Sequence, residues 1–231
     1  GEERFAAEGQ ALAALAGELA RRAVDAAGKP VRVAGSLPPL FGSYRPDLFD
    51  AKRVTELLTP LVKGLAPHVD LWLAETQSSI VEARAIHAGL PKDGKPFWLS
   101  FTLKDEDTDD VPRLRSGEPV ADAAEAAAQL GVQVLLFNCS QPEVIGAAID
   151  AAREVFERLG VNIQIGAYAN AFPPQPKEAT ANDGLDPLRD DLDPPGYLQW
   201  AADWRKRGAS HLGGCCGIGP EHIAVLAQKL A

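Results

Sequence analysis

Three cysteines are the residues of this chain best suited to chemistry. Cys139 follows the apolar run VQVLLFN, and Cys215 and Cys216 are neighbours within HLGGCCGIGPEHI. Three thiols at the ends of two predicted strands indicate a soft-metal site with three protein ligands and one open position, as in catalytic zinc sites. The alternatives are a vicinal disulfide between Cys215 and Cys216, or two inert buried thiols.

Cys215 and Cys216 can bind one ion only if the backbone bends, because neighbouring residues on a regular strand point to opposite faces. Gly213, Gly214 and Gly217 bracket the pair, and glycine permits the positive-φ conformations that such a bend needs. We therefore expect a zinc site made by the three cysteines.

A zinc site with three thiolates would carry a net negative charge and an open position. That position would accept the thiol of a small substrate, whose pKa is ordinarily about 8.5, and metal coordination would deprotonate it. The electron-rich sulfur could then attack a methyl group, which favours methyl transfer. A metal-hydroxide hydrolase more often uses histidine and carboxylate ligands.

The motifs around these cysteines resemble the homocysteine S-methyltransferase family over nearly the whole chain. The resemblance is carried by NC (138–139) and GGCCG (213–217), with support from VAGSLPP (33–39), ETQSSIVEAR (75–84), LSFTL (99–103) and GPEHI (219–223). It implies zinc-dependent transfer of a methyl group to the thiol of L-homocysteine, giving methionine. The methyl donors it implies are S-methylmethionine, S-adenosylmethionine, betaine or a methylated folate. We expect S-methylmethionine or S-adenosylmethionine, because the chain has no second domain for folate or cobalamin.

Three further residues are expected to bind substrate. Glu75 closes an otherwise apolar predicted strand, where a carboxylate could also pair with an arginine or cap the next helix. The resemblance places Glu75 and Thr76 at the position that holds the ammonium of the amino-acid substrate. Asn138 precedes Cys139 and could orient that cysteine, bind substrate, or be a turn residue.

The chain departs from the family in two places. The family's first strand bears an Asp-Gly-Gly motif that nothing here matches. Its run of asparagine, small residue, glycine and glutamate is replaced by YANAFPPQ, which leaves the donor-side contacts open. Tyr168, Phe172 and Trp98 could pack against a cationic donor, or could anchor the core. The four histidines, His211 included, are interpreted as structural.

Apolar runs predict strands over 31–36, 70–75, 96–102, 132–138, 161–167 and 209–213. Helical spacing predicts helices over 5–27, 52–65, 78–88, 119–130, 142–159, 196–207 and 220–230. An acidic loop over 104–118 and a long proline-rich loop over 170–195, typical of a lid or a mobile segment, are expected between them. This alternation predicts an α/β fold, a (β/α)8 TIM-type barrel, with the candidate residues at the C-terminal ends of strands. Since the chain opens on a helix, we expect that the first two strand–helix units of the barrel are missing.

Composition indicates a single domain over 1–231, with 46% hydrophobic residues and a formal net charge of −9. The negative charge argues against nucleic acid, no apolar run reaches the length of a membrane span, and no signal peptide is evident. We expect a cytoplasmic protein that binds small molecules, with an oligomer possible. Two other functions stay open. One is methyl transfer to a selenol or another small thiol, and the other is a non-catalytic zinc- or redox-sensing barrel that uses Cys215 and Cys216.

Overall fold

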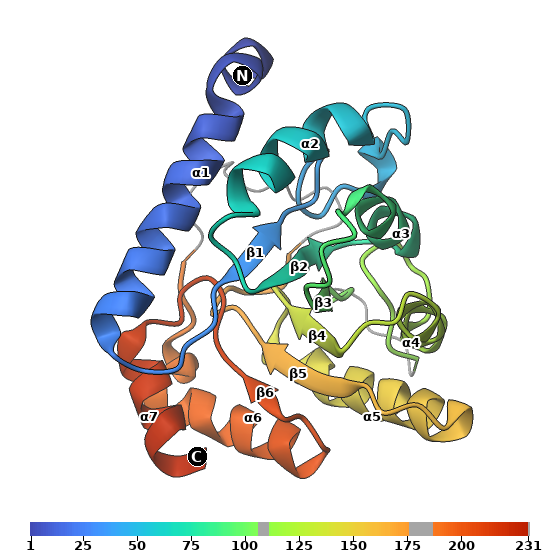
Figure 1. Ribbon diagram of the computed structural model, residues 1–231. Helices are drawn as coiled ribbons and strands as arrows, with labels where there is room; N and C mark the ends of the chain where they lie inside the picture. The colour runs from blue at the N-terminus through green and yellow to red at the C-terminus, as the bar shows by residue number, and fades with distance from the viewer. Residues whose placement is uncertain (106–110, 176–186, 231) are drawn as a thin grey trace.

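The computed structural model describes residues 1–105, 111–175 and 187–230. Within them, six parallel strands lie side by side in chain order, and helices cover the outer side of the sheet (Figure 1). The strands are β1 (Ala34–Leu37), β2 (Leu71–Gln77), β3 (Phe97–Phe101), β4 (Val134–Asn138), β5 (Gln164–Tyr168) and β6 (His211–Leu212). The helices are α1 (Glu2–Ala27), α2 (Val54–Leu65), α3 (Ile80–Gly89), α4 (Val120–Gln129), α5 (Pro142–Leu159), α6 (Pro194–Lys206) and α7 (Pro220–Leu230), with 3-10 turns η1 (Pro46–Leu48) and η2 (Asp190–Leu192).

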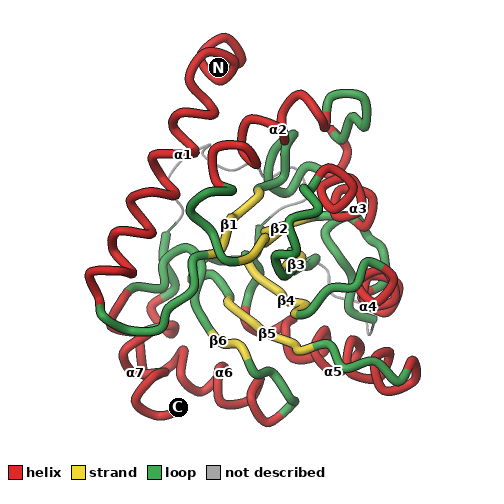
Figure 2. Tube along the Cα trace, viewed as in Figure 1, coloured by secondary structure: helices red, strands yellow, loops and turns green. Residues whose placement is uncertain are grey.

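The sheet is an open arc rather than a closed barrel. Among the described residues, β1 pairs only with β2 and β6 only with β5. Figure 2 shows the strands along the inner side of this arc and the helices outside them. Six consecutive parallel strands with helices between them correspond to part of an eight-stranded (β/α)8 barrel, so the expected α/β, TIM-type architecture is confirmed in this partial form.

Every expected strand and helix is present, but three details differ from the prediction. The first strand begins at Ala34 instead of residue 31, and Val31 is exposed. The strand with Glu75 continues to Gln77, so this carboxylate does not end it. His211 is the first residue of a very short β6 and not the middle of a longer strand.

Helix α1 forms as predicted, and the leucines along it are largely exposed. Leu12, Leu15 and Leu19 are each about half exposed, whereas Gly9 and Gly17 are buried. The helix approaches α2 closely, because a Cβ at Gly64 would lie 2.5 Å from the carbonyl oxygen of Gln10.

Strand residues alternate between two apolar layers, as the pleat of a strand requires. The outer layer lies between sheet and helices and includes Trp72, Leu99, Phe101, Leu135 and Phe137. The inner layer, on the concave side, consists of Leu71, Leu73, Val134 and Leu136, with Trp98 and Tyr168 packed against it. The same alternation places Glu75, Ser100, Asn138 and Tyr168 on the inner side, toward the C-terminal ends of their strands.

Turn and cap residues fix where the helices that follow these strands begin and end. Ser79 is the N-cap of α3 and accepts a hydrogen bond from the backbone of Glu82. Pro142 opens α5, and Gly160 ends it with φ 65°.

No helix among the described residues is long and apolar enough to cross a membrane. The acidic run at 106–110 and the central part, 176–186, of the expected lid or mobile loop lie outside the described residues.

Candidate metal and substrate site

The three cysteines come together at the C-terminal end of the sheet, although 76 residues separate Cys139 from Cys215. Their Sγ atoms lie within 4.8 Å of one another. We call these three residues the thiol cluster. Cys139 is buried, Cys215 is partly exposed and Cys216 is exposed. The cluster therefore extends from the protein interior to the surface.

Two left-handed residues break the alternation of side chains at the site. Cys139 follows the inward-facing Asn138 and has φ 49°, and Thr76 follows Glu75 with φ 61°. Both β2 and the chain after β4 can thus present two consecutive side chains to the region of the thiol cluster. The Thr76 hydroxyl lies 3.9 Å from the Cys139 sulfur. A positive φ is strained for a β-branched residue such as threonine, and such strain is often found at functional sites.

The backbone at Cys215 and Cys216 is bound to the loop after β5. The Cys215 amide donates to the carbonyl of Ala169 at 2.9 Å, and the Ala171 amide donates to the carbonyl of Cys216 at 2.8 Å. Gly217 completes the bend with φ 81°.

Of the three bracketing glycines, Gly217 alone adopts a positive φ, so the conformational reason predicted for Gly213 and Gly214 is wrong. Gly214 is needed for space instead, because a Cβ there would lie 2.1 Å from Cγ2 of Ile218. The corresponding distance at Gly213, 3.4 Å to Cβ of Tyr168, is an ordinary contact.

The three thiols shift one another's pKa values in opposite directions. Hydrogen bonds with Cys139 and Cys215 lower the pKa of Cys216 to about 3, whereas hydrogen bonds with Cys139 and Cys216 raise the pKa of Cys215. For Cys139, the hydrogen bond with Cys215 lowers the pKa, but the effects of Cys216 and burial outweigh it and raise the pKa to about 12. The Cys216 thiolate is thus favoured over those of Cys139 and Cys215, and a bound cation would favour ionisation of all three sulfurs.

The geometry of the cluster suits a tetrahedral zinc ion with one adjustment. Zn–S bonds of about 2.3 Å separate neighbouring sulfurs by about 3.8 Å. The sulfurs of Cys215 and Cys216 lie 3.9 Å apart. Those of Cys139 and Cys215 lie 2.6 Å apart, so an ion would hold them about 1 Å further from each other. Within the described residues, this potential ligand group contains only the three thiols, so a tetrahedral ion held by them would have one further position.

Glu75 is held by hydroxyl groups from two other strands. The Ser36 hydroxyl donates to one carboxylate oxygen at 2.5 Å, and the Tyr168 hydroxyl donates to the other at 3.0 Å. Burial, and then the negative charge of Glu75, raise the pKa of Tyr168 well above its usual value. Tyr168 is therefore a neutral donor. Among the described residues, Glu75 forms neither of the expected alternatives, an arginine pair or a helix cap, and its carboxylate keeps acceptor capacity for a ligand.

Asn138 connects the β2 and β3 residues of the site to the cluster. Its Oδ1 accepts from the Ser100 hydroxyl at 2.7 Å, and its Nδ2 donates to the Thr76 hydroxyl at 2.8 Å and lies 4.0 Å from the Cys215 sulfur. The side chain is fully buried. This geometry suits the predicted role of orienting a cysteine better than direct contact with substrate. Ser100, which lies in the LSFTL motif but was expected only to pack in the barrel, belongs to the same network.

Tyr44 is a site residue that sequence reasoning missed. Burial, followed by the charge of Cys139 and a hydrogen bond with it, raises the pKa of the Tyr44 phenol. The residue has φ 68° and lies in the long loop after β1. Its position among loops at the C-terminal end of the sheet was the only available signal, since nothing in the local sequence separates it from other loop tyrosines.

The remaining candidates lie elsewhere. His211 stacks edge-on against Trp98 on the concave side, with ring centres 4.9 Å apart, and is not part of the thiol cluster. The buried His222 accepts from the Gly219 amide and bonds the Leu192 carbonyl, which supports the structural interpretation of this histidine. Phe172 is half-buried in the loop after β5.

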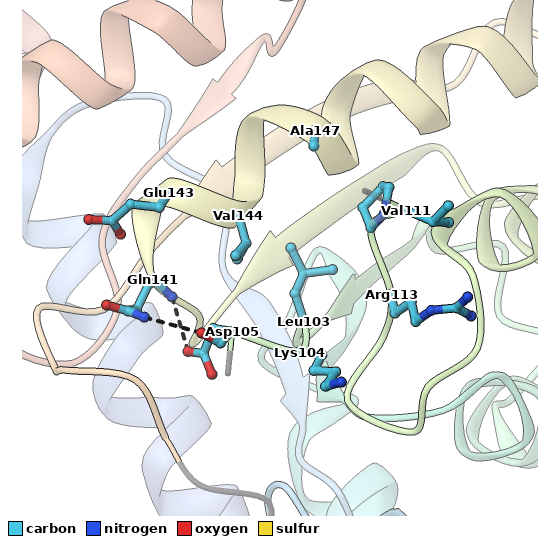
Figure 3. A pocket seen from close by; sticks show the side chains of 10 residues that line it. Leu103, Lys104, Asp105, Val111, Arg113, Gln141, Glu143, Val144 and Ala147 are labelled. Carbon is cyan, nitrogen blue, oxygen red and sulfur yellow. Dashed lines mark hydrogen bonds between the residues drawn. The ribbon is translucent and has the colours of Figure 1, made fainter. Parts of the chain in front are cut away.

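A cavity of about 310 Å³ lies on the outer side of this end of the sheet (Figure 3). Leu103, Val144 and Ala147 supply apolar walls, and no cysteine lines it. Asp105 at its edge accepts hydrogen bonds from the backbone and side chain of Gln141. The cavity is therefore separate from the thiol cluster.

An arc of parallel strands with three convergent thiols at its C-terminal end defines a β/α-barrel protein with a thiol site able to hold a metal ion. The sequence model of the homocysteine S-methyltransferase family matches residues 1–230, and the chain belongs to this family.

Individual relatives agree with this assignment. The chain is 24% identical over 222 residues to maize (Zea mays) homocysteine S-methyltransferase 4, covering 88% of this chain and 60% of the relative. It is 24% identical to bovine (Bos taurus) betaine–homocysteine S-methyltransferase 1, covering 96% and 54%. The crystal structure of the Escherichia coli homocysteine methyltransferase MmuM, in its oxidized form, superposes with a TM-score of 0.71 at 26% identity, covering 97% of this chain and 74% of that one. The chain thus spans less than two thirds of the length of these two curated relatives.

Proposed function

We propose that this chain transfers a methyl group to the thiol of L-homocysteine, using a zinc ion held by Cys139, Cys215 and Cys216. The observation that carries the proposal is the convergence of three thiols next to the inward-facing carboxylate of Glu75. Among the described residues, no other metal-binding side chain joins this group. Membership of the homocysteine S-methyltransferase family supports the same reaction.

The thiol cluster is suited to activating a substrate thiol. A bound zinc ion would supply a Lewis acid that keeps a thiol deprotonated at neutral pH. The cluster residues supply a negative, sulfur-rich environment, so the substrate sulfur retains its nucleophilicity toward a methyl group. Thr76 and Asn138 hold Cys139 and Cys215 from the interior side through contacts of 3.9 and 4.0 Å to their sulfurs.

Glu75 is the proposed ligand for the ammonium group of homocysteine. Its two oxygens are fixed by Ser36 and Tyr168, so the carboxylate is oriented before the substrate binds. An ammonium group would form a charge-assisted hydrogen bond with the capacity that remains. We place Thr76 beside it as a lining residue of the same pocket and Asn138 behind both.

For the methyl donor we propose a sulfonium compound, S-methylmethionine or S-adenosylmethionine. The bovine relative is named for betaine, a quaternary ammonium donor, and both classes present a cationic methyl group. A negative thiol cluster attracts either class. Small molecules are accordingly the proposed partners.

A second candidate is a redox-sensing function of Cys215 and Cys216. Their sulfurs are 3.9 Å apart, Cys216 is exposed, and its lowered pKa favours the reactive thiolate. A related enzymatic alternative is methyl transfer to a selenol or another small thiol.

An activity screen tests these candidates against each other. The chain, purified under reducing conditions, is incubated with homocysteine and with S-methylmethionine, S-adenosylmethionine or betaine, and methionine is measured beside the zinc content. About one zinc per chain and methionine from one donor support the proposal. A metal-free protein whose vicinal thiols oxidise reversibly supports the redox alternative. Zinc without methionine from any donor contradicts the proposed reaction while retaining the metal site.

A further inference from the structure

A buried ion pair lies next to the site and has no role in the function proposed above. Asp105 and Arg115 form it at 3.0 Å, with side chains that are 1% and 5% exposed. Burying two charges is expensive, and such pairs are weak stabilisers of a fold. Both residues lie in the chain after β3, at the C-terminal end of the sheet.

Arg115 bonds to several of the loops that surround the thiol cluster. Its backbone amide donates to Thr102 at 3.1 Å, and its Nη2 donates to the carbonyl of Gln175, in the loop after β5, at 2.8 Å. Its ion-pair partner Asp105 also accepts from Gln141, two residues after Cys139, as Figure 3 shows. The loops after β3, β4 and β5 therefore meet at one guanidinium–carboxylate pair.

The same guanidinium packs on Tyr44, in the loop after β1. Its central carbon lies 5.2 Å from the centre of the Tyr44 ring, within the range of a cation–π contact. Tyr44 has a positive φ of 68°, a conformation that a non-glycine residue keeps only when its surroundings hold it. On its other side, Tyr44 lies close enough to the thiols for the charge of Cys139 to raise the pKa of its phenol, after burial. The ring is thus held between a buried cation and the thiol cluster.

We infer that Arg115 is a positioning residue that fixes the Tyr44 ring beside the thiol cluster. Lysine cannot replace it, because an ammonium group lacks the planar fork that bonds Asp105 and Gln175 while stacking on a ring. The catalytic consequence rests on the proposed methyl transfer. The claim that Arg115 positions Tyr44 does not rest on that reaction, so the positioning and its catalytic effect can fail separately.

Fluorine NMR tests the geometric claim without any activity assay. The chain has 3 tyrosines. Incorporation of fluorotyrosine therefore gives few resonances, which Tyr44→Phe, Tyr168→Phe and Tyr197→Phe assign. We expect the Tyr44 resonance to move when zinc is added to the wild-type protein. In Arg115→Lys it should start from a displaced position and lose most of that zinc response, while the Tyr197 resonance stays in place.

The matched control is Arg113→Lys, two residues away in the same loop, which should behave like wild type. Because Arg115→Lys could fail to fold, Arg115→Met combined with Asp105→Asn removes both buried charges and keeps an acceptor for Gln141. It should displace the Tyr44 resonance in the same way. An unchanged Tyr44 resonance and zinc response in either folded Arg115 variant would overturn the inference. So would a shift of all three resonances together, since that reports a general loss of packing.

Activity supplies the catalytic arm. Because Arg115→Lys disrupts the cation–π contact with Tyr44, we expect kcat/KM to fall about twofold to thirtyfold in this variant. In a Tyr44→Phe background the same substitution should cost less than about twofold, because a group that acts through the Tyr44 hydroxyl has little left to act on. Equal losses in both backgrounds would contradict a role through that hydroxyl. If no variant and no wild type makes methionine, the proposed function fails and the NMR result still decides the positioning claim.

Discussion

Replacing Glu75 with glutamine separates substrate recognition from metal binding. The substitution keeps the shape of the side chain and removes its charge. The hydroxyls of Ser36 and Tyr168, at 2.5 and 3.0 Å, can each donate or accept and can therefore adapt to the new amide. We expect Glu75→Gln to fold normally and to retain the zinc content of the wild type.

The magnitude follows from the bond that is lost. A hydrogen bond to a charged group contributes about 1.5–3 kcal/mol, which is a loss of about tenfold to a hundredfold in homocysteine affinity. The assay is titration calorimetry of the zinc-loaded protein with homocysteine. Its control ligand is the analogue of homocysteine that lacks the amino group but keeps the thiol and the carboxylate.

Binding of the deaminated analogue should change little between wild type and Glu75→Gln, because it has no ammonium to bind. The reasoning is refuted if both ligands lose affinity equally, or if the variant loses zinc. Either result would mean that Glu75 supports the thiol cluster and does not recognise the substrate.

Three further predictions concern the cluster and the fold. Zinc binding should be lost in each of the variants Cys139→Ala, Cys215→Ala and Cys216→Ala, measured by atomic emission, while far-UV circular dichroism stays unchanged. If a variant keeps full zinc, the cysteine that it lacks is not a ligand. Gly214→Ala should lower zinc affinity at least tenfold in a chelator competition, because its Cβ would lie 2.1 Å from Ile218. The matched Gly213→Ala, with 3.4 Å to its nearest neighbour, should bind zinc normally. Similar zinc affinities in the two variants would refute the steric argument. Burial raises the pKa of Glu82, so the folded protein binds this proton more tightly than the unfolded chain, and the free energy of unfolding should fall as pH rises from about 4.5 through the raised value. Urea unfolding should show a weaker fall in Glu82→Gln, and an identical pH dependence in the two proteins would contradict this assignment.

The order of strands and helices was predictable because periodicity and breakers reflect local physics. Helix α5 begins at Pro142 and ends at Leu159, the bounds that helical spacing predicted. The strand containing Val134 and Phe137 was recognisable from its continuous apolar run, which is typical of a strand buried on both faces. The clustering of the cysteines also followed, since the C-terminal ends of parallel strands lie on one edge of a sheet.

The parts that could not be predicted depend on tertiary contacts. Thr76 and Cys139 have positive φ values, and neither residue type signals this conformation in sequence. The partners of Glu75 come from β1 and β5, so they become visible only once strand register is known. Tyr44 reaches the thiols through the path of a loop, and no periodicity describes such a path.

X-ray absorption at the zinc edge tests the central claim most directly. The zinc-loaded chain is measured alone and with saturating homocysteine, and sulfur neighbours at about 2.3 Å are counted. Three thiols with one open position predict three sulfur neighbours before the substrate is added and four afterwards. A count that stays at three with homocysteine bound, or a zinc ion coordinated mainly by nitrogen and oxygen, would contradict substrate activation at the thiol cluster.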